Sequence, residues 1–206
     1  MSLEAWIIFA SFWAVFVTTP GPNAVNCITV AMTYGFKRAL ICVAAILTQA
    51  SLFLALSAFG IKALITTSLM AFFVFKWIGA GFLIYLGIRS WRMASQSEVT
   101  EVPNSQHLYM RAFIIATINP KSVAGYLAAF SQFIQPDLPV MSQMWVITPT
   151  ALGITTLSYV GYCALGSGLG RAALSAMLNT YLRRILAVFF IIYGLLLGTS
   201  QFSRGV

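Results

Sequence analysis

The sequence predicts an all-α integral membrane protein with six transmembrane helices, arranged as two inverted three-helix repeats in which helices one and four are broken. The first observation is composition, because 60% of the residues are hydrophobic and only 8% are charged, whereas about a quarter of the residues of a soluble domain are charged. The second is a series of apolar runs long enough to cross a bilayer. The third is a pair of matching proline breaks, one in each half of the chain.

Six apolar runs approach or exceed the length of about 20 residues that a membrane helix needs. They cover residues 5–34, 39–60, 69–88, 111–134, 144–168 and 182–201. The first run is too long for one straight crossing, since a helix of that length extends about 45 Å against a hydrocarbon core of about 30 Å. We therefore expect it to break, and to be a retained span because no basic residue precedes its apolar part, as one would in a signal peptide.

The two halves of the chain resemble each other. We divide it into a first repeat, residues 1–93, a cytoplasmic linker, residues 94–110, and a second repeat, residues 111–206. The segment KWIGAGFLIY in the third run matches RILAVFFIIY in the sixth, and TTPGPN in the first run has its counterpart TINPKS in the fourth. Because each half has three spans, the second half must lie inverted, an architecture of transporters whose site lies at broken helices near the membrane centre.

The basic residues predict the orientation. They gather in the loops after the first, third and fifth runs, whereas the other side receives only Lys62 and Arg204. Since cytoplasmic loops carry the excess of Lys and Arg, we expect a multi-pass protein of the cytoplasmic (inner) membrane with both termini outside. The net charge of +8 forms no basic face, so we expect the lipid bilayer, and not nucleic acid, as the partner of this surface.

The first break is formed by Pro20, Gly21 and Pro22. Proline has no N–H to donate, so carbonyls one turn earlier lose their helical partners, which is costly in lipid unless they face protein, water or ligand. A helix that restarts after Pro22 presents free N–H groups and a positive dipole end, which suit a carboxylate. Asn23 and Asn26 are three residues apart and share a face of that helix. A binding site and a proline kink with asparagines joining neighbouring helices are both open interpretations.

The second break contains Asn119, Pro120 and Lys121. A charged residue about halfway along a span is costly and indicates function, here binding of a substrate carboxylate or titration. The alternative is that Lys121 extends toward the cytoplasmic surface. Gln49 lies near the centre of the second run and needs hydrogen-bond partners, for which the asparagines of the first break are candidates; a helix-packing hydrogen bond is the alternative.

The acidic residues argue against an enzyme. All four lie outside the centres of the predicted spans: Glu4, Glu98, Glu101 and Asp137. The spans therefore lack the residue sets of an aspartyl pair, a Ser/His nucleophile or a metal centre. The three cysteines are not spaced like metal ligands. We expect no catalytic residues, no metal and no cofactor.

The motifs together resemble a known family. TPGPN late in a long first run, the YGFKRA loop after it, NPKS in the fourth run and GAGFLIYLG in the third resemble the LysE/RhtB family of small bacterial amino-acid exporters, over nearly the whole chain. The resemblance implies export of amino acids or close derivatives, of the homoserine, threonine, leucine or lysine type, across the cytoplasmic membrane and driven by the proton gradient. The motif positions carried over are Thr19, Pro20, Gly21, Pro22, Asn23, Asn119, Pro120 and Lys121.

One position departs from that family. Its members often carry an aspartate in the second span at about the place of Gln49. An amide does not exchange a proton near neutral pH as a carboxylate does, so Gln49 argues against ordinary proton coupling and against a cationic substrate. A neutral substrate, a differently shaped substrate and coupling through Lys121 remain open.

The working hypothesis is a secondary exporter, acting as a homodimer, whose substrate site lies where the two breaks approach each other. Two other classes compete with it. One is a passive pore or lipid-handling membrane protein with a polar cavity near the membrane centre. The other is a structural subunit whose breaks only shape helix packing.

Overall fold

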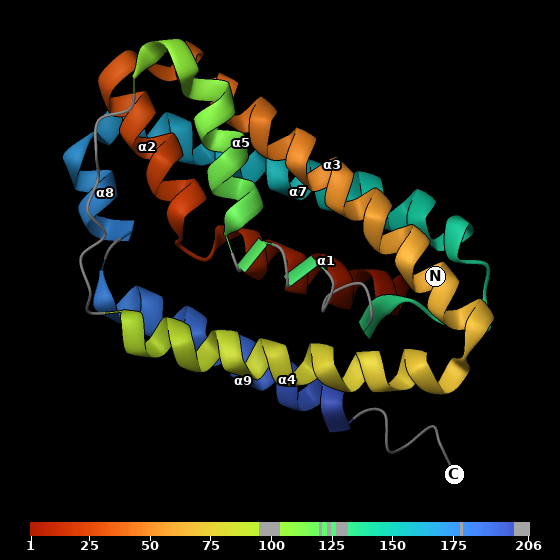
Figure 1. Ribbon diagram of the computed structural model, residues 1–206. Helices are drawn as coiled ribbons and strands as arrows, with labels where there is room; N and C mark the ends of the chain where they lie inside the picture. Colours follow the sequence, from red (N-terminus) through yellow and green to blue (C-terminus); the bar gives the residue numbers. More distant parts are fainter. Residues whose placement is uncertain (95–103, 120, 123–124, 127–131, 178, 200–206) are drawn as a thin grey trace.

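The computed structural model describes residues 1–94, 104–119, 121–122, 125–126, 132–177 and 179–199. Every regular element in these ranges is helical: α1 (Leu3–Thr18), α2 (Pro22–Tyr34), α3 (Phe36–Thr67), α4 (Leu69–Met93), η1 (Ser105–His107), α5 (Leu108–Ile118), α7 (Val140–Leu169), α8 (Arg171–Met177) and α9 (Thr180–Thr199). In Figure 1, α4 and α9 lie side by side along one edge. Helix α1 runs between that pair and the layer of α3 and α7, and it contacts α7 and α9.

Helices lie in each of the six predicted runs, with shifted ends, and residues 120, 123–124 and 127–131 of the fourth run lie outside the described residues. Helix α3 extends beyond the predicted run 39–60 on both sides, and α7 starts at Val140, before the predicted residue 144. The first run breaks as predicted, because α1 ends at Thr18, α2 begins at Pro22, and the two are bent by 57°. Helix α5 begins at Leu108, inside the predicted linker 94–110, and ends directly before Asn119. Residues 95–103 of that linker lie outside the described residues.

Fewer of the described helices are long and apolar enough to cross a membrane than the six that the sequence predicts. In the part of the chain that the structure describes, the stretch Phe36–Ala63 of α3 is long and apolar enough to cross a membrane by itself. The bent pair α1 and α2 meets the same requirement jointly. Helix α7 is long, but threonine, serine and glycine dilute its apolar residues.

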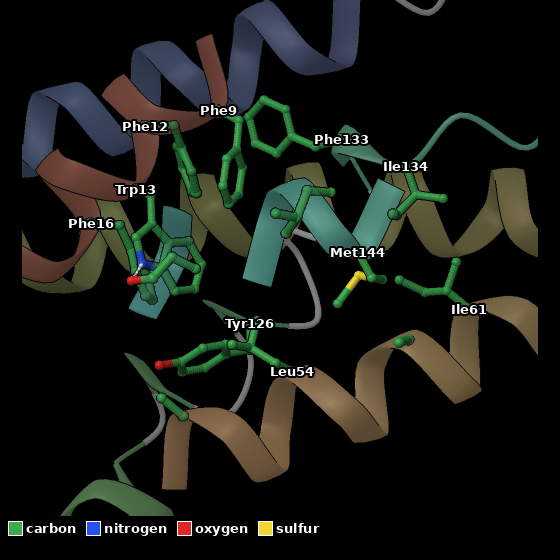
Figure 2. Close-up of a cluster of buried hydrophobic side chains, with 14 of the residues drawn as sticks. Phe9, Phe12, Trp13, Phe16, Leu54, Ile61, Tyr126, Phe133, Ile134 and Met144 are labelled. Carbon is green, nitrogen blue, oxygen red and sulfur yellow. Dashed lines mark hydrogen bonds between the residues drawn. The ribbon is translucent and has the colours of Figure 1, made fainter. Parts of the chain in front are cut away.

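Two buried hydrophobic clusters fill the interior, and the first break separates them. One joins α1, the later part of α3 and the early part of α7, and its aromatic side chains are drawn in Figure 2. The other joins α2, α5, the early part of α3 and the later part of α7. Along α3 the boundary between the two clusters lies between Ile46 and Ala50, and along α7 it lies between Ala151 and Tyr159. Polar side chains therefore gather at a seam between two apolar regions.

Hydrogen bonds from tryptophans fix α1 on α7. The indole N–H of Trp13 donates to the carbonyl oxygen of Ala151 at 3.0 Å and lies 3.1 Å from the hydroxyl of Thr155. The indole N–H of Trp6 donates to the Thr150 hydroxyl at 3.0 Å. These bonds hold α1 against α7 along its length, from Trp6 near its amino end to Trp13 in its second half.

Helices α4 and α9 approach each other closely through two glycines. A Cβ atom added at Gly87 would lie 2.5 Å from the Ile191 Cγ1 atom, and one added at Gly194 would lie 2.6 Å from the Ile84 Cγ1 atom. Gly87 thus packs against Ile191, three residues before Gly194, and Gly194 packs against Ile84, three residues before Gly87. This reciprocal contact requires the two helices to run antiparallel.

Gly87→Leu is expected to lower the free energy of unfolding by about 1–3 kcal/mol, because the larger side chain overpacks the contact with α9. Gly81→Leu is the matched control, since Gly81 lies on the same helix and a Cβ there meets nothing within 4 Å. Thermal unfolding of both variants in detergent measures the difference. Equal stability of the two variants would contradict this description of the α4–α9 contact.

Large apolar side chains cover the outside of several helices. Phe59 on α3 is 64% exposed, and Trp145 and Leu157 on α7 are 81% and 76% exposed. A soluble monomer rarely exposes apolar surface over so many elements. This surface matches the hydrocarbon environment that the composition predicts.

Candidate functional site

Helix α1 ends at the first break, so carbonyl oxygens in its last turn have no helical N–H group from which to accept a hydrogen bond. The Thr19 N–H closes α1 on the Val15 carbonyl at 3.0 Å, and the Thr19 hydroxyl donates to the same oxygen at 2.6 Å. Pro20 and Pro22 have no N–H for the carbonyls that follow Val15. The Tyr162 hydroxyl, from α7, donates to the Thr18 carbonyl oxygen. Protein groups therefore replace helical hydrogen bonds at the break, as lipid-embedded backbone requires.

Tyr162→Phe is expected to destabilise the protein by about 1 kcal/mol, because the Thr18 carbonyl loses the partly buried hydrogen bond that Tyr162 donates. Thermal unfolding in detergent gives the measurement. Tyr181→Phe serves as a control, since Tyr181 is 76% exposed. A Tyr162→Phe protein as stable as this control would show that the hydroxyl does not support the break.

The second break meets the first through Lys121. The side-chain oxygen of Asn119 accepts from the Lys121 backbone N–H at 3.0 Å, which turns the chain at the end of α5. The Lys121 ammonium then donates to the Thr19 carbonyl oxygen at 2.7 Å and lies 5.2 Å from the centre of the Phe16 ring. One cationic side chain thus joins two breaks that are about a hundred residues apart in the sequence.

Helix α2 turns its amino end toward the same place. It begins at Pro22 with no side-chain hydrogen bond to cap it, so first-turn N–H groups and the positive end of its dipole are available to an anion. The Asn23 side chain donates to the Ser122 hydroxyl at 3.5 Å. The Asn23 side-chain oxygen is buried and has no hydrogen-bond partner among the described residues.

A small cavity of about 20 Å³ lies between the two breaks. It is lined by Phe16, Val17, Thr19, Gly21, Asn23, Ile46, Gln49, Asn119, Lys121, Ser122, Tyr126 and Tyr159. That volume suffices for about one water molecule. An amino acid needs more room, so its binding requires the breaks to separate.

Most of the predicted site residues come together at this cavity. Thr19, Gly21, Asn23, Gln49, Asn119 and Lys121 line it. Pro20 and Pro22 flank Gly21 in the break, and Pro120 lies outside the described residues.

Asn26 does not line the cavity, although it shares a face of α2 with Asn23 in the sequence pattern. Its side-chain amide instead points toward the Cys42 sulfur of α3, at 3.7 Å. Nothing in the sequence distinguishes Phe16 and Ile46, which line the cavity, from the many other apolar residues. The serine of TINPKS, Ser122, and the tyrosines Tyr126 and Tyr159 are polar groups in apolar runs, which is the signal that marks them.

Gln49 is buried at the seam between the two apolar clusters. Its side chain is 1% exposed, and neither its amide nitrogen nor its amide oxygen has a hydrogen-bond partner among the described residues. The expected pairing with the asparagines of the first break is therefore wrong, because these groups share the cavity wall without bonding. Each buried polar group left unpaired costs about 1–3 kcal/mol, and such groups are uncommon enough to need an explanation.

The charge of the cavity is positive. Among the described residues that line it, Lys121 is basic and none is Asp or Glu. Across the described part of the chain, no group of three or more His, Cys, Asp or Glu side chains is placed to hold a metal ion. The cavity therefore suits a ligand with a carboxylate, held by the Lys121 ammonium and the amino end of α2.

Comparison with known proteins decides the family. The model of the LysE type translocator family matches residues 14–201. The chain belongs to this family. A membrane protein of Vibrio cholerae described as uncharacterized is 32% identical over 204 residues, covering 98% of this chain and 100% of the relative. No solved structure matches the translocator.

Two further relatives carry a functional name. The homoserine/homoserine lactone efflux proteins of Salmonella typhimurium and Salmonella typhi are each 28% identical to the translocator over 204 residues. The alignments cover 98% of this chain and 99% of each relative. The translocator is thus a membrane protein of an export family, and the relatives with functional names are efflux proteins rather than enzymes.

Proposed function

We propose that the translocator is a secondary active exporter of amino acids or close derivatives, of the homoserine, threonine, leucine or lysine type, across the cytoplasmic membrane. One observation carries this proposal: the Lys121 ammonium stands where two broken helices meet, in a cavity that contains no carboxylate among its described lining residues. The homoserine and homoserine lactone efflux named for the Salmonella relatives supports the same substrate class.

Six crossings in two inverted halves are part of the proposal. The reciprocal contact of α4 and α9 supports it, because Ile84 with Ile191 and Gly87 with Gly194 are related by the same interval along the chain. This interval differs by one residue from the alignment of KWIGAGFLIY with RILAVFFIIY. An antiparallel pair of equivalent helices is what an inverted repeat produces.

In the proposed mechanism, the substrate carboxylate competes with the Thr19 carbonyl for the Lys121 ammonium. The backbone carbonyl is neutral and the carboxylate is charged, so the exchange favours the substrate. Release of Thr19 frees the two breaks from each other and lets the cavity widen to the size of an amino acid. Rocking of one half against the other then opens the site to alternate sides of the membrane.

The remaining features of the proposal concern energy and assembly. We propose that the proton gradient drives export, with both termini outside the cell and the protein acting as a homodimer in the inner membrane. The Gln49 amide does not ionise near neutral pH. We therefore assign proton coupling to Lys121, the basic residue among the described residues that line the cavity.

Counterflow in proteoliposomes tests the function. Purified translocator is reconstituted with an unlabelled amino acid inside, and uptake of the labelled compound is followed for a panel of amino acids, with and without an imposed pH gradient. Saturable exchange of at least one amino acid, altered by the gradient, is expected. Flux that neither saturates nor responds to the gradient would instead identify a passive pore or a lipid-handling protein.

A further inference from the structure

Gln49 places an unused hydrogen-bonding group in the wall of the cavity. Its amide is almost completely buried, and in the part of the chain that the structure describes neither the nitrogen nor the oxygen has a hydrogen-bond partner. It lies on α3 where the two apolar clusters meet, between Ile46 and Ala50. A buried amide is rarely left unpaired, and this one borders the proposed substrate path. It is therefore available to a ligand group that both donates and accepts a hydrogen bond.

Neighbouring groups restrict the charge of such a ligand. The Lys121 ammonium and the amino end of α2 attract a carboxylate. A ligand ammonium meets only neutral acceptors, such as the side-chain oxygen of Asn23, among the described lining residues. A zwitterion fits this cavity, because its carboxylate meets Lys121 and its ammonium meets the neutral acceptors. A second positive charge on the ligand would be buried without a counter-charge.

Resting on the proposed export function, we propose that Gln49 determines specificity and that the substrates are neutral amino acids whose side chain carries a hydroxyl or an amide. The substrate carboxylate binds Lys121, and the side-chain hydroxyl donates to the Gln49 oxygen and accepts from its nitrogen. An apolar side chain leaves the Gln49 amide unpaired, and a cationic side chain lacks a counter-charge. Of the substrate types proposed above, the homoserine and threonine types therefore fit this site, the leucine type fits it poorly and the lysine type does not.

Counterflow with labelled L-homoserine, L-leucine and L-lysine tests this specificity. The wild-type protein is expected to exchange homoserine at least about tenfold faster than leucine, with no exchange of lysine, because a site built to bond a hydroxyl rejects analogues that lack it. In Gln49→Leu the ratio of homoserine to leucine exchange is expected to fall about tenfold or more. Continued leucine exchange shows that this variant is folded.

Two more variants sharpen the test. Ser51→Ala changes an exposed position on the same helix and is expected to leave all three rates unchanged. Gln49→Glu keeps the side-chain shape and adds a carboxylate to the cavity, so it is expected to slow homoserine exchange and to introduce lysine exchange. If Gln49→Leu loses all exchange, the lysine exchange of Gln49→Glu decides, and its absence overturns the proposal.

The outcomes separate this inference from the function on which it rests. Wild-type exchange of leucine or lysine at the homoserine rate, or an unchanged ratio in Gln49→Leu, would overturn the role of Gln49 and leave export intact. Absence of saturable exchange for every amino acid tested with the wild-type protein would overturn both.

Discussion

Lys121→Met is expected to lower amino-acid exchange in proteoliposomes by about 30-fold or more, since removal of one partner from a desolvated charge pair costs about 2–5 kcal/mol or more. Methionine keeps the length and the apolar stem of lysine and removes only the charge and the donors. Lys121→Arg keeps the charge and is expected to retain more exchange than Lys121→Met. Initial rates per unit of reconstituted protein give the comparison.

Lys62→Met is the matched control for this loss, because Lys62 is exposed on α3, away from the cavity. Loss of the bond to Thr19 also lowers stability, so monodispersity of each variant in detergent must be established before its rate is used. A well-folded Lys121→Met protein with the exchange rate of the Lys62→Met control would remove Lys121 from the substrate site.

A second large effect is expected from the double variant Pro20→Ala, Pro22→Ala. Each proline inside a helix costs about 3 kcal/mol, so alanines allow α1 to continue into α2 and to close the bend of 57°. The amino end of α2 would then leave the cavity, and the new N–H groups would compete with Tyr162 for the Thr18 carbonyl. Because small displacements of binding groups reduce rates strongly, exchange should fall by about 100-fold.

Pro149→Ala controls for the removal of a proline as such. Pro149 lies inside α7 and does not line the cavity, so this variant should exchange at the wild-type rate. The double variant must be monodisperse in detergent before its rate is used, which separates loss of the break from loss of the fold. Normal exchange by the double variant would mean that the break serves packing alone.

The positions of the two breaks followed from the sequence because proline acts locally. Pro20 and Pro22 remove backbone donors wherever the chain folds, and Lys121 is conspicuous in an apolar run. The partners of the freed carbonyls did not follow, since Tyr162 is supplied by α7, far away in the chain. A single hydrogen bond from a hydroxyl to a distant carbonyl produces no pattern in the sequence.

Tertiary packing also decided between residues that the pattern made equivalent. Asn23 and Asn26 share a helical face, yet only Asn23 reaches the cavity, because α3 packs beside Asn26 and offers Cys42. The sequence marks Gln49 as a polar residue in need of partners, but its lack of a partner among the described residues is evident only once its neighbours are placed. The antiparallel contact of Gly87 and Gly194 likewise depends on two helices from opposite halves.

The most direct test of the account is an experimental structure of the translocator with its best-exchanged amino acid bound at saturating concentration. The account predicts the substrate between the two breaks, its carboxylate within hydrogen-bond distance of the Lys121 ammonium, and the bond from Lys121 to the Thr19 carbonyl, now 2.7 Å, broken. A substrate bound elsewhere, with that bond intact and the cavity unchanged, would contradict it.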